Sequence, residues 1–300
     1  MKPAPLASAW RSLGHGAVWT GLYVSACCAC AVQTATPGAH PGVWRVLLAA
    51  FLTAQSVYLL DRVKLCDALL DPADRLAHPE RFAFVFGYRR PLRVFLVIEA
   101  ILAGLLLFSM SAVLSLLVPL ALVGVIAYAG LPRSAPIPPG ARRIKDYLIL
   151  KNLAVSVGIC AFSLLLAMGA GGTPAPTLTV WLWPGVFLFL HVLTDSMLCD
   201  IDDRDADARF GTHTLAWRAT PRAVRALSLT IAVLIAIATT LLYRPGAFTR
   251  ISPDLAGTRI AWSVVMAITS AVLVRVRAGH MRDTVDLRLP IVAGVLLVFR

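Results

Sequence analysis

The segment LTDSMLCDIDDRDADARFGTHTLA, residues 193–216, places six aspartates within thirteen residues, directly after an apolar run. Moving a carboxylate into the hydrocarbon of a membrane costs roughly 2.5–3.5 kcal/mol on insertion scales. One interpretation is a solvated acidic loop whose aspartates balance the basic residues around them. The other is a functional site at the edge of a membrane, and the spacing of the aspartates favours this second interpretation.

The spacing places three of the carboxylates on one face if the helix of the apolar run continues through the cluster. At 100° per residue, Asp200, Asp203 and Asp207 share an arc of about 60°, whereas Asp202 and Asp205 fall on the other side. Three carboxylates on one face repel one another unless a cation lies among them. Carboxylate oxygens suit Mg²⁺, which binds one or two of them and keeps positions open for substrate phosphates. The sequence therefore predicts a magnesium site here.

Other polar residues of this segment support a diphosphate site. Arg204 and Arg209 interleave with the aspartates, and guanidinium groups bind phosphates through paired hydrogen bonds. Arg204 is therefore predicted to bind substrate. His191 and Asp195 are four residues apart in the preceding run, so we expect them to form a structural pair away from the metal.

Composition identifies the class of protein around this segment. Of the 300 residues, 58% are hydrophobic and 15% are charged, and the mean hydropathy is +0.77, whereas a soluble domain carries roughly 25% charged residues. Apolar runs long enough to cross a hydrocarbon core of roughly 30 Å recur along the chain, and the backbone in lipid must be helical or form a closed barrel. We predict an all-α, polytopic membrane bundle of about eight or nine helices, in one domain covering 1–300. The expected spans are 13–33, 44–60, 93–109, 111–131, 148–169, 178–198, 224–243, 259–275 and a short 289–299.

The net charge of +12 is distributed as a membrane topology requires. Three connections are basic, and those between them, near 34–43, 110 and 170–177, hold no lysine or arginine. Positively charged loops stay in the cytoplasm, so we expect the N-terminus and the basic loops on the cytoplasmic side of the cell (inner) membrane. No nucleic-acid partner is needed to explain the charge. The basic loops, which also hold the site residues, are 61–93, 131–151 and 199–225.

The segment DIDDRDADARFGTHTLA, residues 200–216, resembles the second aspartate motif of the UbiA superfamily of intramembrane prenyltransferases. The usual form of that motif reads like DIxDxEGDRxxGxxTL. The resemblance implies a helical membrane bundle and a Mg²⁺ that is held by the aspartates and binds a prenyl diphosphate. The residues at matching positions are Asp200, Asp203, Asp207, Gly211, Thr214 and Leu215.

The segment VYLLDRVKLCD, residues 57–67, stands where the superfamily has its first motif, NDxxDxxxD, at the inner end of the second helix. Asp61 and Arg62 match a DR pair often seen in that motif. The resemblance makes Asp61 a metal ligand and a catalytic residue, Arg62 a catalytic and substrate-binding residue, and Tyr58 a substrate contact. Val57 and Tyr58 replace the usual Asn and Asp, and Leu65 replaces the last aspartate, so this motif offers one ligand where the family has more.

The segment RRIKDYLILKNLAVSVG, residues 142–158, resembles the basic segment that enters the fifth helix of the family. The resemblance implies that Lys145, Lys151 and Asn152 contact the diphosphate or the acceptor, with both lysines catalytic. The alternative is an ordinary basic flank that obeys the positive-inside rule.

Together, these resemblances imply a Mg²⁺-dependent enzyme. It would transfer a prenyl group from a polyprenyl diphosphate to a hydrophobic or aromatic, lipid-like acceptor among the membrane lipids, and release diphosphate. A catalytically silent isoprenoid- or lipid-binding or transport protein on the same scaffold is the alternative, because the first motif is degenerate. The CDP-alcohol phosphotransferases also use aspartates at a membrane, but their order, with an AR pair before the aspartates, is not found here.

Overall fold

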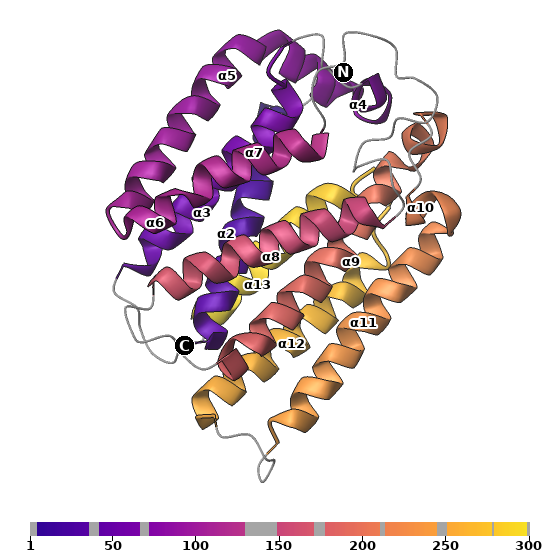
Figure 1. Cartoon of the computed structure of the whole chain (residues 1–300). Helices are drawn as coiled ribbons and strands as arrows, with labels where there is room; N and C mark the ends of the chain where they lie inside the picture. Colours follow the sequence, from indigo (N-terminus) through magenta and orange to yellow (C-terminus); the bar gives the residue numbers. More distant parts are fainter. Residues whose placement is uncertain are drawn as a thin grey trace.

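A computed structural model describes residues 5–35, 42–66, 72–129, 149–170, 178–210, 214–244, 251–277 and 279–298. Every regular element in these ranges is a helix (Figure 1). The helices of the first half are α1 (Pro5–His15), α2 (Val18–Ala35), α3 (Val43–Val63), α4 (Pro72–Ala77), α5 (Pro79–Phe108), α6 (Ala112–Ser115) and α7 (Leu117–Ala129). Those of the second half are α8 (Leu150–Ala170), α9 (Leu178–Phe210), α10 (Leu215–Arg218), α11 (Pro221–Leu242), α12 (Pro253–Leu273) and α13 (Met281–Val298).

The long helices confirm the predicted class of an all-α polytopic membrane bundle. Seven of them, α2, α3, α5, α8, α9, α11 and α12, are long and apolar enough to cross a membrane. A shorter apolar pair, α6 and α7, occupies most of the fourth expected span. Exposed large hydrophobic side chains on these helices, such as Leu105 and Leu234, face outward, as expected of a lipid-facing surface.

Several helices extend beyond the expected spans. The helix α5 begins at Pro79 rather than near residue 93, and α9 continues to Phe210. Much of the expected loops 61–93 and 199–225 is therefore helical, and that part of the prediction was wrong. Hydropathy marks where a helix leaves the lipid, not where its hydrogen bonds end, and Pro79 begins α5 at a position that favours proline.

The two ends of the chain depart from the expected spans in different ways. The first span is divided, because Ala17 takes a left-handed φ of 61° between α1 and α2. The last helix, α13, begins eight residues earlier than the expected 289–299. Its first turns were missed because they are rich in charge; they hold Arg282, Asp283, Asp286 and Arg288.

The helix α2 is the centre of the bundle. Fifteen of its eighteen residues are buried, and it packs against α3, α8, α9, α12 and α13. Alanine, cysteine and glycine dominate its sequence, and small residues let membrane helices approach closely. At Gly21, for example, an added Cβ would lie 2.9 Å from the Phe51 side chain of α3.

Two buried arginines join this core. Arg259 of α12 is 1% exposed and donates hydrogen bonds to the Thr34 and Val180 carbonyls, each at 2.8 Å, and to the Tyr243 hydroxyl at 2.6 Å. It thereby links α2, α9, α11 and α12. Deeper in the α2–α9–α13 contact, Arg288 forms an ion pair with Asp195 in which both side chains are 3% exposed.

The expected pairing of His191 with Asp195 was wrong. Asp195 accepts from Arg288 and, at 2.8 Å, from the Tyr23 hydroxyl. Neither ring nitrogen of His191 has a hydrogen-bond partner in the described part of the chain, and the ring packs on Phe187 at 4.5 Å between centroids. A charged donor from another helix makes the stronger hydrogen bond, so the local i, i+4 neighbour is not used.

Candidate active site

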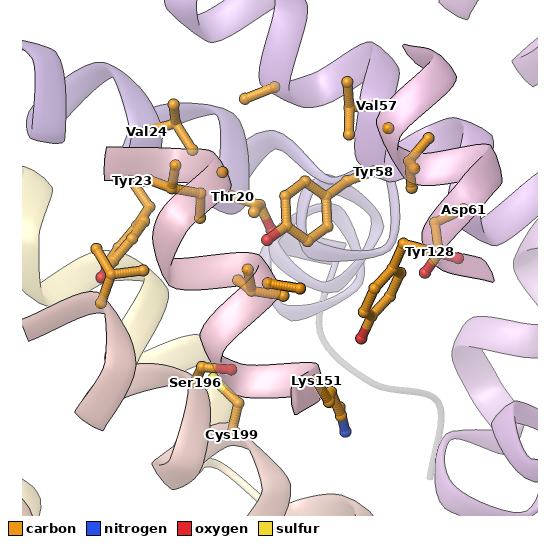
Figure 2. Close-up of a pocket in the computed structure, with 18 of the residues that line it drawn as sticks. Thr20, Tyr23, Val24, Val57, Tyr58, Asp61, Tyr128, Lys151, Ser196 and Cys199 are labelled. Atoms are coloured by element: carbon orange, nitrogen blue, oxygen red, sulfur yellow. The ribbon is translucent and has the colours of Figure 1, made fainter. Parts of the chain in front are cut away.

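A cavity of about 620 Å³ lies between α2, α3, α7, α8, α9 and α13, and α4 and α5 also contribute to its lining. Figure 2 shows side chains from α2, α3, α7 and α8, among them Thr20, Tyr58, Tyr128 and Lys151, directed into one space. The wall formed by α7 and α8 is mostly apolar, whereas most of the charged lining side chains come from α3, α9 and α13. The charged lining residues are Asp61, Arg62, Asp74, Arg81, Lys151, Asp195, Asp200, Asp203, Asp207, Arg282 and Asp286.

Asp200 is held by the first turn of α8. The Lys151 Nζ lies 2.6 Å from its Oδ1, and the Asn152 Nδ2 donates to its Oδ2 at 3.0 Å. Asn152 also donates to the Ser196 hydroxyl at 2.9 Å and does not line the cavity. Lys151 is thus at the cavity as expected, whereas Asn152, predicted to bind substrate, positions Asp200 instead.

Asp203 is held by two residues that the sequence did not single out. The Nε2 of His78, which precedes α5, lies 2.6 Å from its Oδ1, and the Nη2 of Arg282, in the first turn of α13, lies 2.5 Å from its Oδ2. Burial lowers the pKa of His78 below its usual value, and the hydrogen bond with Asp203 acts in the opposite direction. Neither residue belongs to a recognisable motif, and 125 and 79 residues separate them from Asp203.

Asp207 of α9 and Asp61 of α3 are the other two predicted metal ligands that line the cavity. Asp207 is 7% exposed, and its Oδ2 is buried without a hydrogen-bond partner in the described segments. Asp61 accepts from the Lys64 Nζ at 2.5 Å and lines the same cavity. The two aspartate motifs therefore face one cavity, and their role as metal ligands stays a prediction.

The other residues of the first motif also lie near this cavity. Tyr58 lines it, as does Val57, one of the positions that departs from the family pattern. Arg62 lines it as well, but its Nη1 donates to the carbonyls of Gly14 and His15 at 2.7 and 2.8 Å. That guanidinium closes the turn between α1 and α2, which is a structural role that the sequence did not suggest.

The remaining predicted site residues are not at the cavity. Arg204 does not line it, because one step along a helix turns the side chain by 100° from Asp203. Its predicted substrate contact is therefore not supported by the geometry. Lys145 lies outside the described residues, and so does Gly211 of the second motif.

Asp202, which belongs to the same cluster of aspartates, has a structural role. Its Oδ1 accepts from the Gly279 amide at 2.7 Å and its Oδ2 from the Arg282 amide at 3.0 Å. A carboxylate at a helix N-terminus satisfies free amides and opposes the helix dipole. Asp202 therefore fixes the start of α13 beside α9, while Asp205 is exposed to solvent.

The residues at the cavity fit a divalent cation bound together with a diphosphate. In the described part of the chain, no three carboxylate, histidine or cysteine groups are close enough to hold a metal by themselves. Mg²⁺ needs only one or two carboxylates when substrate phosphates complete its shell. Seven aspartates and four basic residues line the cavity in these segments, and Arg288 and Lys64 pair with two of those aspartates from outside the lining, so the remaining excess of negative charge is small. The buried, unpartnered Oδ2 of Asp207 is available to such an ion.

Comparison with known proteins agrees with this architecture. No family model matches the sequence, and no curated protein matches it. A UbiA homolog from Archaeoglobus fulgidus superposes with a TM-score of 0.62 at 11% identity, covering 96% of this chain and 98% of that one. A UbiA homolog from Aeropyrum pernix K1 gives a TM-score of 0.61 at 17% identity, covering 93% and 97%. Digeranylgeranylglyceryl phosphate synthase gives 0.52 at 15% identity, covering 95% and 94%.

The protein is thus an integral membrane helical bundle. Its cavity is lined by aspartates at one end and by the apolar side chains of α7 and α8 along one wall. Its fold is shared with these UbiA homologs along nearly the whole chain. The resemblance first found in the aspartate motif is confirmed at the level of the fold.

Proposed function

We propose that the protein is a Mg²⁺-dependent prenyltransferase that moves a prenyl group from a polyprenyl diphosphate to a hydrophobic or aromatic acceptor. The observation that carries this proposal is the composition of one cavity. Asp61 from the first motif and Asp200, Asp203 and Asp207 from the second line its polar end, and the α7–α8 wall lines the rest with apolar side chains. The charged diphosphate of a prenyl donor matches the polar end, and its apolar tail matches the α7–α8 wall.

The chemistry follows from the residues present. Asp61, Asp200, Asp203 and Asp207 would hold Mg²⁺, which when bound supplies Lewis-acid stabilisation of charge on the leaving diphosphate. Lys151 neutralises further charge on that diphosphate. The bond between the prenyl carbon and the diphosphate oxygen breaks, and its electron pair leaves with the diphosphate. An electron pair of the acceptor forms the new bond to that carbon, and the acceptor loses a proton to a carboxylate or to the released diphosphate.

The comparisons support the donor class. The Archaeoglobus fulgidus homolog has been solved with GPP and Mg²⁺ and with DMAPP and Mg²⁺, and these structures superpose on this chain with TM-scores of 0.61 and 0.59 at 12% identity. Those ligands belong to that protein. The matching fold, together with the resemblance of residues 200–216 to the second aspartate motif of the family, extends the donor class to this chain as a proposal.

A second candidate function is a catalytically silent isoprenoid-binding or transport protein. Val57 and Tyr58 stand in the first motif where the family pattern has Asn and Asp, and both line the cavity. This degenerate first motif leaves fewer ligands on α3, which favours binding without turnover.

The experiment that separates these functions uses the full chain purified in detergent. It is incubated with geranylgeranyl diphosphate, Mg²⁺ and a panel of phenolic and lipid acceptors, and release of diphosphate is measured. For an enzyme, we expect release that requires an acceptor and stops when EDTA removes the metal. Saturable binding of the donor with no release in any arm supports the silent protein, and absence of both binding and release contradicts both candidates.

The proposed place of the reaction is the cytoplasmic face of the cell (inner) membrane. The segments 61–93 and 199–225, which carry the aspartates, are basic, and basic segments beside the membrane spans remain in the cytoplasm. Cysteine-accessibility labelling at the exposed Cys66 in intact cells tests this orientation. Labelling only after permeabilisation is expected, whereas labelling by an impermeant reagent in intact cells would contradict it.

Filling the apolar wall is expected to shorten the donor that the protein accepts. Gly124 of α7 and Gly158 of α8 line the cavity, and a Cβ added at either meets no atom within 4 Å. Gly158→Leu therefore places a side chain in open space rather than against the protein. We expect the affinity for geranylgeranyl diphosphate to fall roughly 15- to 60-fold, because the leucine side chain takes the space of roughly two to three CH₂ groups of the tail, each worth about 0.8 kcal/mol. The affinity for dimethylallyl diphosphate is expected to stay the same.

The matched control for this change is Gly104→Leu. Gly104 of α5 also has open space around an added Cβ but does not line the cavity. Donor-displacement binding with the two diphosphates measures the effect. Equal losses for both donors, or the same loss in Gly104→Leu, would show that the glycine wall does not hold the tail.

A further inference from the structure

Arg282 lies at the cavity, but the proposed reaction assigns no role to it. Its guanidinium lines the cavity and pairs with Asp203, the residue at the centre of the second motif. With His78 on the other oxygen, both oxygens of Asp203 are occupied. Each oxygen keeps a second lone pair, but a divalent cation bound there would lie beside the guanidinium charge of Arg282, and the repulsion between the two cations favours displacement of Arg282.

Geometry distinguishes Arg282 from the fixed arginine on the same helix. The side chains of Arg288 and Asp195 are each 3% exposed, whereas those of Arg282 and Asp203 are 26% and 16% exposed. A buried pair cannot separate without leaving an uncompensated charge, which is strongly unfavourable. A pair that faces a cavity exchanges partners at lower cost, because water or another ion replaces each lost contact.

The start of α13 is anchored so that the side chain of Arg282 can move while its backbone stays. Asp202 binds the amides of Gly279 and Arg282. Gly279 adopts a φ of 89°, a left-handed conformation that favours glycine. Asp202 and Asp203 are adjacent in α9, so one turn of that helix holds both the backbone and the guanidinium of Arg282.

We infer that Arg282 is a displaceable counter-ion. It holds the Asp203 carboxylate in the metal-free protein, and it moves to the diphosphate of the donor when that carboxylate is given up to a divalent cation. The guanidinium suits the second role because its planar donors match phosphate oxygens. This inference rests on the proposed function, in that it takes a metal diphosphate as the ligand of the cavity.

The inference predicts two effects of opposite sign for Arg282→Gln. Without the guanidinium, Asp203 is free for a metal, so Mn²⁺ alone is expected to bind about tenfold more tightly. Inorganic diphosphate in excess Mg²⁺ is expected to bind about tenfold more weakly, because a charged donor has been removed. Isothermal titration calorimetry on the detergent-purified full chain measures both affinities.

Controls separate this role from a structural one. Arg275→Gln removes an exposed arginine that does not line the cavity, and it is expected to leave both affinities within about twofold of wild type. If thermal unfolding shows that Arg282→Gln does not fold, Arg282→Lys carries the test. It keeps the charge but loses the planar fork, so both effects are expected with the same signs and smaller size.

Three outcomes would overturn the inference. If Arg282→Gln binds both ligands more weakly, Arg282 has a structural role. If it binds both more tightly, Arg282 only blocks the site. If neither affinity changes, Arg282 does not contact either ligand. The proposed function fails separately. If Arg282→Gln shows the opposite-sign effects but the wild-type protein never releases diphosphate from a prenyl donor, the counter-ion role stands and the enzyme assignment fails. If the wild-type protein releases diphosphate but Arg282→Gln shows no such effects, the enzyme assignment stands and the counter-ion role fails.

Discussion

Asp203→Asn is expected to lower the rate of diphosphate release by about 10²–10³-fold, the size found when one group that stabilises developing charge is removed. Asparagine keeps the shape of the side chain and one carbonyl oxygen. It loses the negative charge that pairs with Arg282 and that would bind a divalent cation. The measurement is release of diphosphate from geranylgeranyl diphosphate at saturating Mg²⁺.

The matched control is Asp205→Asn, two residues further along the same helix. Asp205 is exposed and does not line the cavity, so the change removes the same charge from the same segment. Its rate is expected to stay within about twofold of wild type, because surface charges contribute little. Equal losses in the two variants would mean that the net charge of the segment matters and the position of Asp203 does not. A melting temperature for each variant shows that the comparison is between folded proteins.

Arg288→Gln is expected to lower the free energy of unfolding by about 3–5 kcal/mol, the cost of leaving one member of a buried ion pair without its partner. Asp195 and Arg288 are both 3% exposed, in the contact of α9 with α13. The Tyr23 hydroxyl on α2 donates to the same carboxylate, at 2.8 Å, and one neutral hydrogen bond does not offset a buried charge. Unfolding in mixed micelles with increasing SDS measures the change.

The double variant Asp195→Asn with Arg288→Gln is the informative comparison. Two neutral amides retain hydrogen bonding between α9 and α13 without a buried charge, so most of the stability is expected to return. Arg11→Gln serves as the control for an exposed ion pair: Arg11 pairs with Glu80 at 3.0 Å with side chains 43% and 68% exposed, and less than about 1 kcal/mol is expected. If the double variant is no more stable than Arg288→Gln, the unpaired charge of Asp195 is not the cause of the lost stability.

Local spacing predicted one face of the site correctly. The period of a helix placed Asp200, Asp203 and Asp207 together, and all three line the cavity because α9 does continue through the cluster. The same spacing turned Asp202 and Asp205 away, which also agrees with the structure. It failed for His191, because spacing along one helix does not reveal a stronger partner on another.

Sequence by itself determined the class of this protein: hydropathy is a property of each segment, and a segment in lipid must satisfy its own backbone hydrogen bonds. It also determined which aspartates share a face, since that depends on 3.6 residues per turn. Only the tertiary structure decided what those aspartates meet. His78 and Arg282 reach Asp203 across 125 and 79 residues of chain, and α13 is held in place by Asp202. Such partners depend on how helices pack in three dimensions, and no spacing along the chain encodes them.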